Sequence, residues 1–255
     1  MPVVRLNQGL EVQNVSKTFY SAKSYFTAVQ DVSFALNDGE FLVILGPGRC
    51  GKSVLLKMIA GLENPTGGKI LYNGAEKKGY HPDFGMVFQN IALMPFKTTM
   101  ENVEVPLKLA GVKKAERRKV AQHYINLVGL QGFEKSYPYQ LSGGMKQRVG
   151  IARAYAANPK VLIMDEPFGQ LDAQTRYAMQ NEILRIWEAE KRTLIFVTNN
   201  LEEACYLGDR IILLSDCPAT VKETYPVDLP RPRDMTSPAF LSMRTQISDN
   251  SDLSI

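Results

Sequence analysis

Residues 41–53 read FLVILGPGRCGKS, an apolar run followed by a glycine-rich loop, and this stretch decides the fold class. The loop matches the phosphate-binding pattern G-x-x-x-x-G-K-[ST] at Gly46, Gly51, Lys52 and Ser53. The apolar run before it predicts a buried strand, and VLLKMIAGL after it predicts a helix that ends at Gly61. Because strand, loop and helix follow one another directly, the stretch predicts a nucleotide-phosphate site in an α/β fold and not an ordinary glycine turn.

The loop residues divide the work of holding phosphate. Backbone amides between Gly48 and Ser53 would converge on phosphate oxygens at the start of the helix, where the helix dipole favours negative charge. The Lys52 ammonium would neutralise phosphate charge, and the Ser53 hydroxyl would coordinate Mg²⁺. The thiol of Cys50, inside the loop, is either accessible or simply fills a position that needs a small side chain, and the second interpretation is favoured.

Composition indicates a globular chain with an ordinary surface charge. Its 255 residues fit one large α/β domain or a core domain with a sizeable insertion, and its net charge of +4 favours a plain solvated surface over a nucleic-acid site. No apolar run approaches the roughly 20 residues that span a bilayer, and MPVVRLNQGLEV lacks the apolar core of a secretory signal. Its three cysteines form no paired framework or metal-ligand cluster, so we expect a reducing, cytosolic compartment.

Strand and helix patterns alternate along most of the chain. Strands are predicted at 10–19 and 27–36, and again at 160–167, 193–197 and 210–214. Between the later strands, the pattern predicts a helix over 201–207 and a longer helix with four large residues on one face, Met179, Ile183, Ile186 and Trp187. This alternation predicts a mainly parallel sheet with helices on its faces.

Two segments depart from the alternation. From Met100 to about Ala157 the strand character fades, which predicts a helical insertion. Within it, residues 116–130 place four side chains on one helical stripe, Val120, Tyr124, Leu127 and Val128. Beyond Leu229 the sequence turns polar and loses its periodicity, so we expect a tail with at most one short helix.

Two adjacent carboxylates follow the apolar run in KVLIMDEP, residues 160–167. The strand would deliver Asp165 and Glu166 to its carboxyl end, near the phosphate loop of an open α/β sheet. Asp165 would hold Mg²⁺ through water, and Glu166 would polarise an attacking water as the general base. The alternative, two solvated acids at a strand end, is disfavoured by the phosphate loop in the same chain.

A second anion-binding helix start is predicted in LSGGMKQRVGIARAYA, residues 141–156. One nucleotide does not need two such anion-binding helix starts, and we call the one at residues 141–156 the second cradle. This stretch resembles a motif of the ATP-binding cassette (ABC) family. The other motifs of that family resemble the phosphate loop, Gln89, the MDEP at 164–167 and the Leu171–Asp172 pair, and the resemblance covers about residues 10–225.

The resemblance implies both a fold and an assembly. It implies a P-loop NTPase core with a mainly parallel sheet, an N-terminal antiparallel β subdomain and a helical subdomain at about 95–157. These parts would form a nucleotide-binding domain over 10–229, followed by a C-terminal tail over 230–255. It also implies a head-to-tail dimer, in which Ser142, Gly143 and Gly144 contact the γ-phosphate of an ATP bound to the partner's phosphate loop. That arrangement would account for the second cradle.

The resemblance also assigns further contacts to ATP and Mg²⁺. Phe19 would stack on the adenine, with Tyr20 as the alternative, while Gln89 would sense Mg²⁺ and relay the nucleotide state to the helical subdomain. The remaining nucleotide contacts would come from the phosphate loop and from the residue after Leu171, namely Gly46, Gly48, Arg49, Cys50, Gly51, Lys52, Ser53, Val54 and Asp172. The Mg²⁺ ligands would be Ser53, Gln89 and Asp165.

Four positions depart from the family pattern. Asn199 stands where importer ATPases usually carry a switch histidine, Arg49 replaces a glycine, Val54 replaces a hydroxyl residue, and GQLD at 169–172 replaces the commoner SALD. An asparagine amide can donate a hydrogen bond to phosphate but cannot become cationic, so we expect ATP binding with slow hydrolysis. Arg49 either donates to a phosphate or crowds a loop that prefers glycine, and the sequence leaves both open.

Residues 93–107 resemble the stretch of importer ATPases that follows Gln89. Residues 206–244, with LPRPRD at 229–234, resemble the ATPases of nitrate, sulfonate and taurine importers. The resemblance implies an ATPase subunit at the cytoplasmic face of the cell membrane that powers uptake of a small anion, such as nitrate, sulfonate, taurine or bicarbonate. Its partners would be a second ABC ATPase subunit, two transmembrane permease subunits and, indirectly, a solute-binding protein, with no nucleic acid. One alternative is a catalytically weak regulatory subunit paired with an intact cassette. Another, a soluble cassette of DNA repair or translation, is disfavoured because no long heptad insertion is present.

Overall fold

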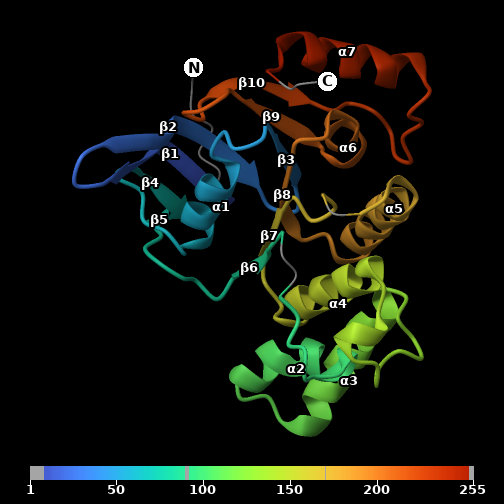
Figure 1. Cartoon of the computed structure of the whole chain (residues 1–255). Helices are drawn as coiled ribbons and strands as arrows, with labels where there is room; N and C mark the ends of the chain where they lie inside the picture. The colour runs from blue at the N-terminus through green and yellow to red at the C-terminus, as the bar shows by residue number, and fades with distance from the viewer. Residues whose placement is uncertain (1–8, 90–91, 170, 253–255) are drawn as a thin grey trace. The chain divides into compact units, whose positions relative to one another are not determined.

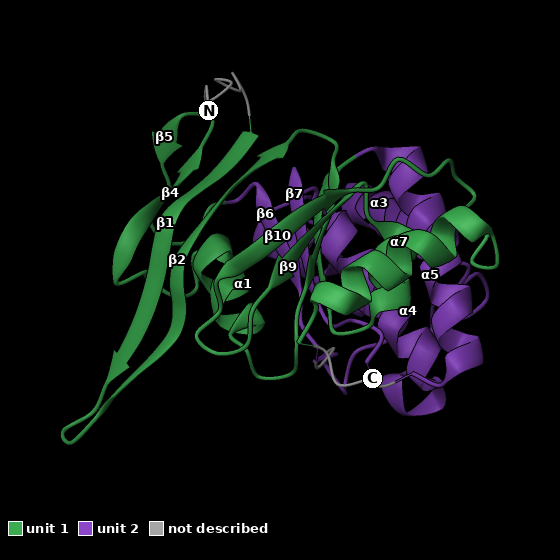
Figure 2. Cartoon of the chain, turned by 90° about the horizontal axis from the view of Figure 1, so that it is seen from above, with its two compact units in different colours: residues 1–81, 192–255 green, residues 82–191 purple. Residues whose placement is uncertain are grey.

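The apolar run before the glycine loop forms a fully buried strand, β3 (Phe41–Leu45), in the computed structural model, which describes residues 9–89, 92–169 and 171–252. The chain divides into two units, coloured separately in Figure 2. Unit 1 comprises residues 1–81 and 192–255, and unit 2 comprises residues 82–191. Both units combine strands with helices, so the predicted α/β class is confirmed.

Unit 1 contains an antiparallel sheet of β1 (Gly9–Tyr20), β2 (Tyr25–Asn37), β4 (Gly67–Tyr72) and β5 (Ala75–Glu76), in the order β2-β1-β4-β5. β1 and β2 form a long hairpin that brings Phe19 opposite Phe26 and Tyr20 opposite Tyr25. The antiparallel β subdomain implied by the family resemblance is therefore present.

The other strands of unit 1 surround β3. β8 (Thr193–Thr198) and β9 (Arg210–Leu214) both run parallel to β3, one on each side, and β10 (Val221–Pro226) pairs antiparallel with β9. The apolar strands β3 and β8 are buried at every position, as expected for parallel strands covered on both faces. The sequence did not predict β10, whose polar VKETYP buries only Tyr225 deeply.

Three helices complete unit 1, and Figure 1 shows their order along the chain. α1 (Lys52–Ala60) follows the phosphate loop and ends at Gly61, which takes the left-handed conformation at φ 79° and so confirms the predicted helix end. α6 (Leu201–Leu207) follows β8. α7 (Pro238–Asn250) lies against α6 and buries Phe240 and Ile247. The predicted tail thus contains one helix, which is docked through two apolar anchors spaced two turns apart.

Unit 2 pairs β6 (Phe84–Val87) in parallel with β7 (Val161–Asp165). Its helices are α2 (Thr99–Leu109), α3 (Lys114–Leu127), α4 (Gly143–Ala156) and α5 (Ala173–Glu190), with a short 3₁₀ turn, η1, at Pro138–Gln140. α2, α3 and α4 pack on one another, so the helical character predicted from Met100 to about Ala157 is confirmed. The apolar face predicted for α5 is confirmed too, because Met179, Ile183, Ile186 and Trp187 are all buried.

The stripe predicted for α3 is partly wrong. Tyr124 and Val128 are buried as predicted, but Val120 and Leu127 are only half-buried, and Ala121 and Ile125 take their places in the core. Small Ala121 and branched Ile125 share one face with Tyr124 and Val128 at helical spacing, so the buried stripe is rotated by one residue. The predicted stripe ran through Val120 and Leu127, whereas the burial of Ala121 and Ile125 depends on how α3 packs in the fold.

Among the described residues, no helix is both long enough and apolar enough to cross a bilayer.

Candidate nucleotide-binding site

The phosphate loop of unit 1 depends on Gly51, which has φ 121° and caps the start of α1. A Cβ built on Gly51 would lie 2.3 Å from the carbonyl oxygen of Ala28 and 3.3 Å from Cβ of Ala219. Since a contact of 2.3 Å with backbone is not tolerated, only glycine fits where β2 presses on the loop. At Gly48 the space that a Cβ would occupy meets no atom of the described residues within 4 Å, so among them the outer side of the loop is open.

Lys52 is buried inside this loop. Its Nζ donates to the carbonyl oxygens of Gly46, at 2.9 Å, and Pro47, at 2.6 Å. The ammonium is therefore held among the loop's own carbonyls, next to the amides that follow. The loop can supply a fixed positive charge and a helix N-terminus together, which is the chemistry that a phosphate group needs.

Cys50 is fully buried. The interpretation that its thiol is accessible, which the sequence left open, is therefore wrong. Its Sγ lies 3.2 Å from the position of a Cβ on Gly46, so thiol and glycine fit against each other across the loop. Burial raises the pKa of the Cys50 thiol, while the nearby Lys52 ammonium acts in the opposite direction. Cys50 serves as a small buried side chain that shapes the loop.

Arg49 is exposed and has φ 65°, in the left-handed region. For a residue with a Cβ this conformation costs about 1–2 kcal/mol relative to the right-handed one. The backbone thus supports the interpretation that Arg49 occupies a position suited to glycine. Val54, the other departure in this loop, is half-buried, and its amide donates to Gly51 O at 3.0 Å within the first turn of α1.

The end of β8 adjoins the phosphate loop. The amide of Gly46 donates to Thr198 O at 3.4 Å, and the Thr198 hydroxyl accepts from the Asn200 amide at 3.0 Å. Asn200 caps α6, since its Oδ1 accepts from the Glu203 amide at 2.9 Å. Asn199, immediately before it, is exposed. Asn200 therefore caps the helix, whereas Asn199, the predicted switch residue, is exposed to solvent.

Both candidates for adenine stacking lie at the end of the β1–β2 hairpin. Phe19 is 40% exposed, and the Lys17 ammonium lies 5.1 Å from its ring centroid. Tyr20 is more exposed and stands opposite Tyr25. Both aromatic rings are reachable, so the structure keeps both candidates.

In unit 2, β7 delivers its carboxylates as predicted. Asp165 is buried at the end of the strand, and Glu166 follows with φ 41° directly before Pro167. A left-handed residue before proline is strained, and such strain is typical of functional sites that need a side chain in one direction. Gln89 Nε2 lies 4.0 Å from the position of a Cβ on Gly169, in the turn after Glu166. Unit 2 therefore brings the amide of Gln89 to the turn that follows the predicted general base.

The second cradle is the start of α4. Ser142 caps the helix, with its Oγ accepting from the Met145 amide at 3.3 Å. A Cβ on Gly144 would lie 2.8 Å from Cγ2 of Thr175, so a larger residue would collide with the first turn of α5. Among the described residues, a Cβ on Gly143 would come within 4 Å of Leu171 alone, at 3.9 Å from its Cδ2.

Asp172 and Thr175 fix the neighbouring helix start. Asp172 caps α5, accepting from the Thr175 amide at 2.9 Å and from the Thr175 hydroxyl at 2.8 Å, and these hydrogen bonds lower the pKa of the Asp172 carboxyl. Thr175 thus joins the Asp172 turn to Gly144. The sequence analysis missed Thr175, although a threonine three residues after a helix-capping aspartate was a visible signal.

The structure distributes the predicted site residues over the two units. Unit 1 holds Phe19, Gly46, Gly48, Arg49, Cys50, Gly51, Lys52, Ser53, Val54 and Asn199, and unit 2 holds Gln89, Ser142, Gly143, Gly144, Asp165, Glu166 and Asp172. Gln170, within the departing GQLD stretch, lies outside the described residues. The contacts of these residues with a nucleotide stay predictions.

Comparison with known proteins decides the family. The family model of the ABC transporters matches residues 29–169. An uncharacterized ABC transporter ATP-binding protein of Methanocaldococcus jannaschii is 48% identical, over 95% of this chain and 91% of that protein. The chain belongs to the ABC transporter family. Membership in this family implies ATP binding and ATP hydrolysis coupled to transport.

Further relatives of this ABC protein carry more specific names. The nitrate import ATP-binding protein NrtD of Synechococcus elongatus is 39% identical, over 92% of this chain and 88% of that protein. The aliphatic sulfonates import ATP-binding protein SsuB of Bacillus anthracis is 41% identical, over 93% of this chain and 94% of that protein.

A solved structure supports the fold as well. A dimeric bacterial ABC transporter cassette is similar with a TM-score of 0.75 and 32% identity, over 86% of this chain and 98% of that one. The same cassette in a dimeric post-hydrolysis state, bound to ADP and phosphate, gives the same values. The family and the fold inferred from the sequence motifs are confirmed.

The left-handed backbone at Arg49 leads to a stability prediction. Arg49→Gly relieves the cost of the Cβ but adds chain entropy to the unfolded state, so we expect the free energy of unfolding to rise by about 0.5–1 kcal/mol. The matched control is Arg49→Ala, which removes the guanidinium but keeps the Cβ, and should give no such gain. Urea unfolding without nucleotide measures both. A glycine variant no more stable than the alanine variant would contradict the backbone interpretation.

Proposed function

We propose that this protein is the ATP-hydrolysing subunit of an importer that takes up a small anion, such as nitrate, a sulfonate, taurine or bicarbonate, through separate permease subunits. The observation that carries the proposal is the phosphate loop, where the close approach at Gly51 and the buried Lys52 build an anion site. Relatives named for nitrate import and for aliphatic sulfonate import, at about 40% identity over most of the chain, support the importer class and a small anionic solute.

The residues present fit Mg-ATP. The open side of the loop at Gly48 leaves room for phosphates, and Lys52 with the start of α1 would bind them. The proposed metal ligands, Ser53, Gln89 and Asp165, offer a hydroxyl, an amide and a carboxylate, all of them oxygen donors of the kind that Mg²⁺ prefers. When bound, Mg²⁺ would neutralise charge on the phosphate oxygens.

Hydrolysis would depend on Glu166 and Asn199. Glu166 would accept the proton of the attacking water, and its strained backbone, with φ 41°, is of the kind found at functional sites. Asn199 would donate a hydrogen bond to the γ-phosphate from its exposed position at the end of β8. Because its amide stays neutral, we expect slower turnover than a cationic histidine would give.

The second cradle would serve a second ATPase subunit. Ser142 and the two glycines after it would contact the γ-phosphate of an ATP held on the phosphate loop of the partner, as the similarity to dimeric cassettes supports. We propose a second copy of this chain as that partner, with a related cassette as the alternative. The cap of Asp172 on α5 supports the cradle by holding Thr175 against Gly144.

The permease would dock on unit 2 near Gln89, at the cytoplasmic face of the membrane, while a solute-binding protein would act indirectly. Large apolar side chains are exposed there, namely Phe88, Met94 and Phe96, the last at 91%. The buried amide of Asn102 fixes this segment, accepting from the Met94 amide at 2.8 Å and donating to the carbonyls of Lys97 and Thr98. A rigid loop that presents an exposed aromatic side chain suits a protein partner.

A regulatory subunit that pairs with an intact cassette is the second candidate function. The neutral amide of Asn199 favours it, since this position lacks an ionisable imidazole. The hydrolysis rate of the purified chain separates the two functions.

Replacing the switch residue tests the catalytic part. Asn199→His should raise the single-turnover rate at saturating Mg-ATP by at least tenfold, because a lost transition-state donor costs about 100- to 1,000-fold and the asparagine recovers only part of that. Asn199→Ala, which removes the donor altogether, should be slower than the wild type. A histidine variant that is no faster than the wild type would count against the assignment.

The exposed Phe96 tests the partnership with a permease. When the chain is co-expressed with the permease pair of a small-anion importer, Phe96→Ser should reduce co-purification about tenfold or more, while ATP binding is unchanged. Leu109→Ser is the matched control, because Leu109 is 84% exposed at the end of α2, outside the 88–96 segment. Equal loss in both variants, or retention in both, would argue against docking through Phe96.

A further inference from the structure

The segment Leu229–Asp234, LPRPRD, follows β10 in unit 1 and carries two arginines that no part of the nucleotide chemistry uses. Arg233 is only 6% exposed. A buried arginine is rare unless its charge is compensated, so its partners indicate what it holds in place.

Arg233 holds the carboxyl end of α6. Its guanidinium donates to five backbone carbonyls, those of Cys205 at 2.9 Å, Tyr206 at 3.0 Å, Gly208 at 2.7 Å, Val227 at 3.2 Å and Leu229 at 3.3 Å. The first three belong to the last turn of α6 and its cap, where unpaired carbonyls carry partial negative charge. Burial lowers the pKa of Arg233 to about 10, which still leaves the group protonated at neutral pH.

Arg231 binds the same helix end and connects it to β3. It forms an ion pair with Asp209 and donates to the carbonyl of Leu207. Asp209 is in turn fixed to the first residue of β3, because its Oδ2 accepts from the Phe41 amide at 2.9 Å and its own amide donates to Phe41 O at 2.8 Å. The arginine pair therefore fastens α6 to the strand that leads into the phosphate loop.

The opposite end of α6 begins at the switch position. Asn200 caps the helix directly after Asn199, and both Asn200 and Gly46 are hydrogen-bonded to Thr198. α6 has seven residues, or about 10 Å, less than two full turns. A helix this short moves as one piece, so fixing its last turn also fixes its cap.

We propose that Arg233, assisted by Arg231, is a positioning residue for Asn199: the guanidinium fixes α6 within unit 1, next to the start of β3, and thereby holds the switch amide at the distance from the phosphate loop that hydrolysis requires. The proposal rests on the switch role proposed for Asn199. It assigns a part in turnover to the LPRPRD segment, whose two arginines bind the end of α6 and Asp209.

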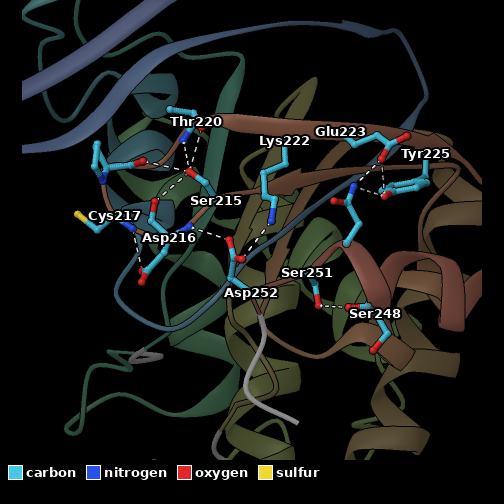
Figure 3. Close-up of polar contacts among 12 residues, drawn as sticks. Ser215, Asp216, Cys217, Thr220, Lys222, Glu223, Tyr225, Ser248, Ser251 and Asp252 are labelled. Atoms are coloured by element: carbon cyan, nitrogen blue, oxygen red, sulfur yellow. Dashed lines mark hydrogen bonds and ion pairs between the residues drawn. The ribbon is translucent and has the colours of Figure 1, made fainter.

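The end of α7 and the residues just after it are anchored separately, which supplies a control. Figure 3 shows Asp252, just after α7, between Lys222 Nζ at 3.0 Å and the amide of Asp216 at 3.4 Å. Asn250 likewise donates to Glu223 and to the Tyr225 hydroxyl. Lys222→Met releases one of these anchors without touching α6.

The experiment compares Arg233→Lys and Arg233→Met with Lys222→Met in single-turnover hydrolysis and in ATP binding. A displaced switch should lower the hydrolysis rate about tenfold in Arg233→Met and less in Arg233→Lys, with the Kd for ATP within about twofold of the wild type. Lys222→Met should match the wild type in both measurements. If Arg233→Met does not fold, Arg233→Lys carries the test. A weaker Kd with an unchanged rate, or an equal loss of rate in Lys222→Met, would overturn the proposal.

A double variant separates this inference from the proposed function. If Arg233 acts through Asn199, the variant that combines Arg233→Lys with Asn199→Ala should be no slower than Asn199→Ala alone. Losses that multiply would overturn the positioning role while leaving the switch assignment intact. An Asn199→Ala variant as fast as the wild type would instead overturn the switch assignment, and the inference with it.

Discussion

The approach of backbone to backbone at Gly51 is the constraint on which the phosphate loop depends. The carbonyl of Ala28, in β2, occupies the space that any Cβ at this position would need, and Ala219 closes the same space from the turn before β10. The loop is thereby held between β2 and the turn before β10, and α1 starts directly after it. A triphosphate carries several negative charges, and a helix start with a buried lysine next to it offers those charges partners.

A second helix start that depends on a glycine occurs in unit 2, with different residues. Ser142 caps α4, and Gly144 must be a glycine because the methyl group of Thr175 lies against it. Thr175 is itself fixed by Asp172, so the start of α4 and the start of α5 form one rigid corner. A chain with two glycine-dependent helix starts can offer one to its own nucleotide and one to another chain, and this supports a motor in which closure of two subunits depends on ATP.

Local patterns predicted much of this structure, and long-range contacts explain what they missed. The phosphate loop, the apolar face of α5 and the end of α1 follow from spacing within a few residues, which a sequence displays directly. The burial of Cys50 depends on Gly46 across the loop, and the docking of α7 depends on Phe240 and Ile247 finding a surface made by distant residues. The five carbonyls around Arg233 belong to three separate elements or loops, so nothing local in LPRPRD could show them. Spacing within the chain predicted the phosphate loop and the two carboxylates after the apolar run of β7, whereas the roles of Gln89, Asn199 and Ser142 rest on the family resemblance. The contacts of all these residues with a nucleotide stay predictions.

Mixing two inactive variants tests most directly whether each site is built from two chains. Lys52→Ala removes the charge of the phosphate loop, and Ser142→Arg blocks the second cradle, so each variant alone should lack ATPase activity. In a mixed dimer one site would contain both defects and the other would be intact, and random pairing should restore up to about a quarter of the wild-type rate. A mixture no more active than its separate components would contradict the shared site.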